Sequence, residues 1–79
     1  MSPEERKRHQ NHLTLAEVYR KEAQGLREKW FRELRRPKWT LQEVELKWSQ
    51  SKEAAQARRR LDWAEKYQRY AETLAASAH

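Results

Sequence analysis

The sequence predicts an all-α protein, an antiparallel helical hairpin whose second helix is the longer one. Charged residues make up 38% of the 79 residues and only one residue is glycine, a composition that favours long helices over sheet. Apolar residues recur at steps of three and four in two long stretches, as they do on one face of a helix. Pro37 lies between these stretches and disfavours helix in the residue before it. The length allows one domain, so residues 1–79 are predicted to form a single small helical domain.

The first thirteen residues form a polar arm. Ser2, Pro3 and Glu5 fit a helix start, because they supply a cap, a first-turn proline and a capping-box acid. Residues 1–13 lack an apolar stripe, so we expect a helical arm that is frayed or is ordered only against a partner. A second start signal, Thr14 followed three positions later by an acid, predicts that the first main helix begins there.

The first main helix is predicted to run from residue 14 to residue 36. Gly25 lies inside it and costs about 1 kcal/mol relative to alanine. Its missing side chain either lets another group approach closely or simply weakens the helix. The apolar stripe of this helix contains Leu15, Tyr19, Ala23, Leu26, Trp30 and Leu34.

The second helix is predicted to begin at Thr40, with Glu43 as the capping-box acid. Trp39 and Val44 flank the cap in the positions of a hydrophobic staple. If the chain folds back about Pro37-Lys38, large residues face small ones in a coiled-coil-like seam. The expected pairs are Leu34 with Leu41, Trp30 with Val44, Leu26 with Trp48, Ala23 with Ser51, and Tyr19 with Ala55.

The apolar stripe changes direction in the C-terminal third of the chain. Two explanations fit this change. Either the helix breaks near Ser49–Ser51, with Ser51 capping a third helix, or one helix runs from Thr40 to Ala76 and its two halves pack on different surfaces. Serine is a weaker helix breaker than glycine or proline, so the continuous helix is the preferred expectation.

The C-terminal stripe is expected to lack a partner within the chain, because the second helix is longer than the first. Tyrosine and tryptophan are enriched at interfaces, so we expect this face to bind another protein or a second copy of the chain. The competing interpretation is that the arm of residues 1–13 folds over this face and Leu13 completes a small core. The candidate protein-binding residues are Leu61, Trp63, Tyr67, Tyr70 and Leu74.

The net charge is +6, and it favours an acidic partner, either a protein surface or a nucleic acid. Residues 27–60 hold eleven basic and five acidic residues, so the excess is concentrated in the middle of the chain. The candidate residues for an acidic surface or a nucleic acid are Arg35, Arg36, Lys38, Arg58, Arg59 and Arg60. Residues 40–44 followed by 57–61 loosely resemble a helix-turn-helix, although the usual glycine turn is missing. DNA or RNA binding is therefore the alternative function.

Other classes of function find little support. Without cysteine there is no disulfide and no thiolate metal site. Glu5, His9 and His12 have a metal-ligand spacing, but the neighbouring residues 6–8 are basic and disfavour a cation. The chain has neither a glycine-rich phosphate loop nor a plausible catalytic triad, so we expect no enzyme activity, cofactor or small-molecule substrate. The absence of a signal peptide and of a membrane-length apolar run predicts a cytoplasmic protein, or a nuclear one in a eukaryote.

Overall fold

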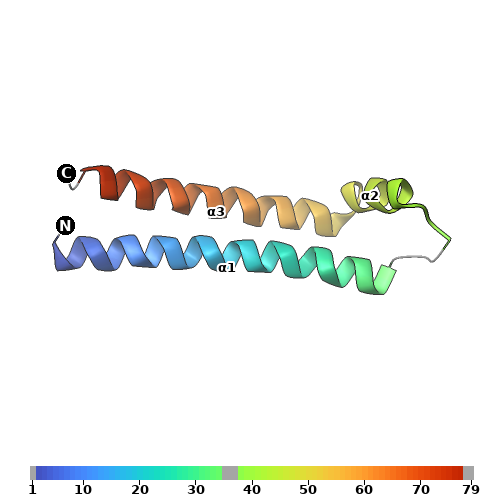
Figure 1. The fold of residues 1–79 in the computed structure, drawn as a ribbon, viewed down its shortest axis with the longest axis horizontal. Coiled ribbons are helices and arrows are strands. Elements are labelled where there is room, and N and C mark those ends of the chain that lie inside the picture. The colour runs from blue at the N-terminus through green and yellow to red at the C-terminus, as the bar shows by residue number, and fades with distance from the viewer. Residues whose placement is uncertain (1, 35–37, 78–79) are drawn as a thin grey trace.

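The computed structural model describes residues 2–34 and 38–77, and every regular element in these residues is a helix. The longest and thinnest dimensions of the protein are 56 and 16 Å. α1 packs against α3, and Figure 1 shows the two chain ends at the same end of the molecule and α2 at the other. The predicted all-α class is confirmed. The predicted corner, with Arg35, Arg36 and Pro37, lies outside the described residues. The helices are α1 (Pro3–Leu34), α2 (Leu41–Ser49) and α3 (Lys52–Ser77).

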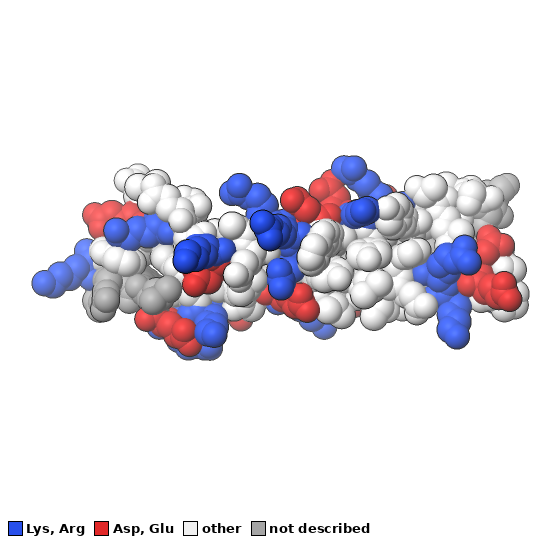
Figure 2. Space-filling model, turned by 180° about the vertical axis from the view of Figure 1, so that it is seen from behind, with Lys and Arg blue, Asp and Glu red and all other residues white. Residues whose placement is uncertain are grey.

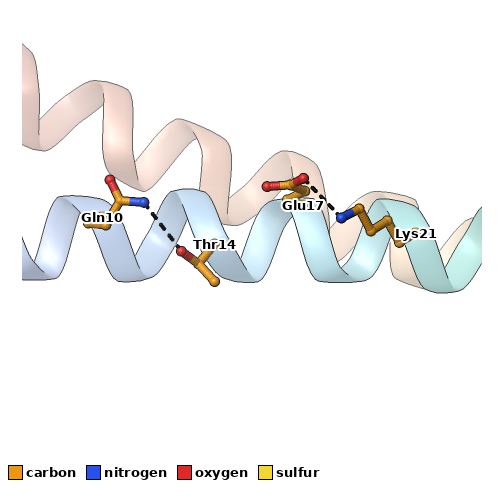
Figure 3. Close-up of polar contacts among 4 residues, drawn as sticks. All are labelled: Gln10, Thr14, Glu17 and Lys21. Atoms are coloured by element: carbon orange, nitrogen blue, oxygen red, sulfur yellow. Dashed lines mark hydrogen bonds and ion pairs between the residues drawn. The ribbon is translucent and has the colours of Figure 1, made fainter.

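α1 is one uninterrupted helix that begins where the sequence predicts. The Glu5 N–H donates to Ser2 Oγ at 3.2 Å, and the Ser2 N–H donates to the Glu5 carboxylate at 3.4 Å, which completes a capping box. The start predicted at Thr14 is wrong. Thr14 lies inside α1, where its Oγ1 accepts a hydrogen bond from Gln10 at 3.5 Å, and the Glu17–Lys21 ion pair follows on the same helix (Figure 3). A capping signal cannot start a helix where the preceding turns are already helical.

The second arm of the chain is broken, so the continuous helix expected from Thr40 to Ala76 is wrong and the alternative is right. α2 ends at Ser49 and α3 begins at Lys52. Ser51 Oγ accepts a hydrogen bond from the Ala54 N–H at 3.0 Å and donates to the Trp48 carbonyl at 2.6 Å. The same hydroxyl therefore satisfies one backbone group of each helix.

The start of α2 agrees with the prediction. The Thr40 side chain accepts from the Glu43 N–H at 3.2 Å, as an N-cap should. Trp39 is half-buried and packs against the cluster of buried residues that contains Val44. This cluster occupies the end of the molecule that holds α2, where the Trp30 and Trp48 rings meet edge to face at 5.6 Å.

The remainder of the core is a seam of small residues between α1 and α3. Buried residues recur every seven positions on both helices, which is the spacing of a coiled coil. Alanine at most of these positions leaves little side chain between the two backbones, so the helices can approach closely. The residues are Ala16, Ala23 and Trp30 on α1, and Ala57, Ala64 and Ala71 on α3.

The predicted register holds only near α2. Trp30, Val44 and Trp48 share one cluster, but Tyr19 contacts Trp63 and Tyr67 rather than Ala55, which is exposed. The break at residues 50–51 causes this difference, because it changes which face of α3 meets α1.

Two further expectations about buried leucines are wrong. Ala16 is buried where Leu15 was expected, and Leu15 is partly exposed. Leu41 keeps 74% of its surface exposed, so it does not occupy a seam position. The side chain of its expected partner, Leu34, is not among those described. No helix in the described residues is long and apolar enough to cross a membrane.

Candidate protein-binding surface

Aromatic rings from α1 and α3 gather on one side of the helix pair. Tyr19 meets the Trp63 ring edge to face at 5.3 Å and stacks on Tyr67 at 5.8 Å. His12 stacks on Tyr67 at 5.9 Å and lies 5.7 Å from the ring of Tyr70. The expectation that the C-terminal stripe lacks a partner within the chain is therefore wrong. The competing interpretation is correct in that residues 3–13 are part of the helix that covers this stripe.

Much of this aromatic surface nevertheless remains open to solvent. Trp63 and Tyr70 keep 45% and 46% of their surface exposed, although both touch rings of α1. They are seven residues apart, so they lie on the same face of α3. Tyr67 and Leu74 are half-buried between this face and the seam.

α1 extends the same apolar surface. Leu15 lies one helical turn before Tyr19, and Val18 directly precedes Tyr19 in the sequence. The side chains of Leu15 and Val18 are 37% and 42% exposed. Figure 2 shows, from behind, an uncoloured area that spans both helices in the half nearer the chain ends, with Lys and Arg side chains beside it. We call this surface the aromatic flank, defined by Leu15, Val18, Tyr19, Trp63, Tyr67 and Tyr70.

Cationic side chains border the aromatic flank. The Arg60 guanidinium lies 5.9 Å from the centre of the Trp63 ring and pairs with Glu22 at 3.2 Å. Lys66 Nζ lies 5.9 Å from the centre of the Tyr70 ring. Both distances are within the range of a cation–π interaction, so each cation sits beside an exposed ring.

Leu61 does not belong to this surface. It precedes Trp63 by two residues, which places the two side chains about 200° apart around α3. Leu61 is half-exposed and lines a groove on the opposite side of the helix pair. The five candidate protein-binding residues therefore divide into four that share one side and one that faces away.

The candidate basic residues do not share a surface either. Arg60 turns to the aromatic flank, whereas Arg58 lines the groove on the opposite side. Arg59 lies between them in sequence and is about 100° from each around the helix. Lys38 is exposed near the start of α2, and Arg35 and Arg36 lie outside the described residues. α2 continues roughly in line with α3 (Figure 1), unlike the crossed helices of a helix-turn-helix.

The opposite groove has a volume of about 380 Å³ and was not predicted from the sequence. It lies where α2 meets α1 and α3. Its apolar lining consists of Ala23, Trp48, Ala54, Ala57 and Leu61, and its cationic lining consists of Arg20, Arg27 and Arg58.

His12 is held by tyrosines rather than by metal-ligand neighbours. Its ring lies within 6 Å of the rings of Tyr67 and Tyr70. Across residues 2–34 and 38–77 there is no group of three His, Cys, Asp or Glu side chains placed to hold a metal ion.

No protein-family model, curated protein or solved structure matches this chain.

Proposed function

We propose that the chain is a non-enzymatic protein-binding module, a helical hairpin whose aromatic flank docks on an acidic surface of another protein. The observation that carries this proposal is the exposure of Trp63 and Tyr70, which keep 45% and 46% of their surface open beside Leu15 and Val18. Large aromatic side chains that are buried on binding contribute most of the energy at many interfaces. An apolar patch that spans two helices is typical of an interaction surface.

The charges around the aromatic flank favour an acidic protein over a second copy of the chain. Arg60 and Lys66 border the exposed rings, and Lys29 lies near Arg60 along a shallow recess. Glu22 is the acid in this recess, and it is already paired with Arg60. Two copies meeting through the part of the flank around Arg60 and Lys29 would bring like charges together, which opposes association. The recess beside Tyr70 is mixed, because Asp62 and Glu65 line it together with Lys66.

Nucleic-acid binding is the less supported alternative. A phosphate backbone is best bound by several cations on one surface. Arg58, Arg59 and Arg60 diverge around α3, and Arg60 is engaged with Glu22. A gel shift at two salt concentrations tests this alternative, since binding through phosphates would weaken steeply as salt increases.

The proposal is tested by site-specific photo-crosslinking. A benzophenone amino acid at position 63 or 70 should crosslink to an acidic protein, whereas the same group at exposed Glu72, about 180° from Trp63 around α3, should not. The identified partner is then titrated with the Trp63→Ser/Tyr70→Ser protein, for which we expect at least about tenfold weaker binding. Leu41→Ser removes a still more exposed apolar side chain from α2 and should leave the affinity unchanged.

Several results would contradict the proposal. Equal crosslinking from positions 63 and 72, or crosslinks only to a second copy, would show that the flank does not select an acidic partner. Tyr67 and Leu74 are unsuitable for this test because both are half-buried, so changes there would disturb folding as well as binding.

A further inference from the structure

The groove opposite the aromatic flank is built from two parallel stripes of side chains. α1 contributes Arg20, Ala23, Gln24 and Arg27, and α3 contributes Ala54, Ala57, Arg58 and Leu61. Each set follows the spacing i, i+3, i+4 and i+7, which is two turns of one helical face. Two such faces side by side form the surface on which a third helix packs in a bundle.

The floor of the groove suits the close approach of a helix. Ala23, Ala54 and Ala57 are buried, so the floor is made of short side chains. Trp48 from α2 lies in the lining at the end near the helix break, and Leu61 lies one turn beyond Ala57 with half its surface exposed. The stripes are about 10 Å long, the length of two turns of a partner helix.

The rim of the groove is cationic, and none of the described residues that line it is acidic. The positive charge of Arg27 is compensated, because its guanidinium pairs with Glu45 at 2.6 Å and lies over the Phe31 ring. Arg20 donates only to the neutral Gln68 amide oxygen at 3.2 Å. Arg58 has no hydrogen-bond or ion-pair partner in the part of the chain that the structure describes. Two positive charges, one on each wall, therefore lack a counter-charge from the lining.

We infer that this groove binds an acidic amphipathic helix of a second protein. The apolar stripe of that helix would lie on the alanine floor, and its flanking aspartates or glutamates would meet Arg20 and Arg58. Docking by an amphipathic helix in an apolar groove uses anchors at the same i, i+3, i+4 and i+7 spacing. Because the groove and the aromatic flank lie on opposite sides, one copy of the chain can hold two partners at once and acts as an adaptor.

The inference is tested with a synthetic peptide of about four helical turns, with leucines on one face and glutamates beside them. Its binding to the full chain is followed by fluorescence anisotropy of a label on the peptide. We expect saturable binding that Leu61→Glu weakens at least about tenfold, because a charge then occupies the apolar floor. Arg58→Glu should weaken binding about tenfold, since it places like charges against the glutamates.

Arg59→Glu is the matched control. It makes the same change of charge one residue along α3 and away from the groove lining, so it should change the affinity by less than about threefold. A peptide of the same composition in scrambled order is the second control. Its affinity for the natural chain should be no higher than the affinity of the original peptide for the Leu61→Glu chain. Circular dichroism verifies that each variant keeps its helices.

Several results would overturn the inference. These are the absence of saturable binding, equal binding of the scrambled peptide, equal losses for Arg58→Glu and Arg59→Glu, and competition by a second copy of the chain for the groove. Loss of peptide binding in Trp63→Ser/Tyr70→Ser but not in Leu61→Glu would also overturn it, since the peptide would then occupy the aromatic flank. The adaptor role rests on the proposed function, so failure of the crosslinking test at the flank would remove that role and leave helix binding in the groove standing.

Discussion

His12 combines two opposing contributions to stability. Its ring contacts Tyr67 and Tyr70, which joins the N-terminal turns of α1 to the C-terminal half of α3. Its Nδ1 atom is buried and makes no hydrogen bond within the described residues. An unsatisfied buried polar atom costs about 1–3 kcal/mol, whereas an aromatic pair contributes about 0.5–1.5 kcal/mol.

Replacing His12 by phenylalanine should therefore stabilise the protein. Phenylalanine keeps an aromatic ring against the two tyrosines and removes the unsatisfied nitrogen, so we expect the free energy of unfolding to rise by about 1 kcal/mol. Urea denaturation followed by circular dichroism measures this change. His12→Gln keeps a polar side chain and should give no gain. A loss of stability in His12→Phe would mean that the nitrogen has a partner in solution.

Gly25 also weakens the protein at the scale of a single residue. A Cβ atom built at this position would meet no atom within 4 Å, so the glycine does not serve a close approach inside the molecule. Gly25→Ala should raise the free energy of unfolding by about 1 kcal/mol through helix propensity. The opposite change at an exposed helical site, Ala55→Gly, should lower it by about the same amount. Equal stability of Gly25→Ala and the natural chain would contradict this account.

At the scale of elements, the break between α2 and α3 depends on one hydroxyl. Ser51→Ala removes the acceptor of the Ala54 N–H and should lower the free energy of unfolding by about 1 kcal/mol. Ser51→Asp keeps an acceptor and should retain most of the stability. Ser49→Ala is the control, because Ser49 only donates to the Leu46 carbonyl in an exposed turn. Thermal unfolding of the three variants distinguishes the loss of the capping hydrogen bond from a general effect of removing a serine hydroxyl.

Capping signals in the sequence correctly predicted where three helices begin. Ser2, Thr40 and Ser51 all cap helices, because a cap needs only its own side chain and a backbone N–H three residues on. Thr14 carries a similar signal and fails, since the helix that precedes it continues through its position. Local chemistry therefore predicts where a helix can begin, and the surrounding fold decides whether it does.

The sequence predicted the aromatic flank better than it predicted the seam. Periodicity placed Tyr67 and Trp63 near one face, and their ring contacts agree with this. It favoured Leu15 over Ala16 for the seam, because leucine is the more hydrophobic residue. The closely packed helices instead bury the smaller side chain. The groove could not be predicted, because it depends on how the break turns α3 relative to α2.

At the scale of the whole molecule, the chain is a rod rather than a globule. Its radius of gyration is 17.0 Å, against about 12 Å for a compact domain of this length. The cross-section is two helices wide, so each stretch of α3 depends on the stretch of α1 that lies beside it. Stability is therefore distributed along the rod instead of being concentrated in one centre.

Removing residues 2–13 should affect the far end of α3. The deletion takes away His12 and exposes Tyr67 and Tyr70, so we expect the free energy of unfolding to fall by at least about 2 kcal/mol. Hydrogen exchange should become faster in the last turns of α3, while the amides near Val44 and Trp48 keep their protection. Uniform loss of protection would show instead that the rod unfolds as one cooperative unit.

The position of the two chain ends has a consequence for attachment. Both ends lie at one tip of the rod, and α2 lies at the other (Figure 1). Anything fused to either end, whether a fluorescent reporter, a surface linker or another folded unit, is held at the same tip. The rod then stands out from its point of tethering by most of its 56 Å length. Both long sides stay accessible in that geometry, so immobilised protein is suited to measuring the two surfaces separately.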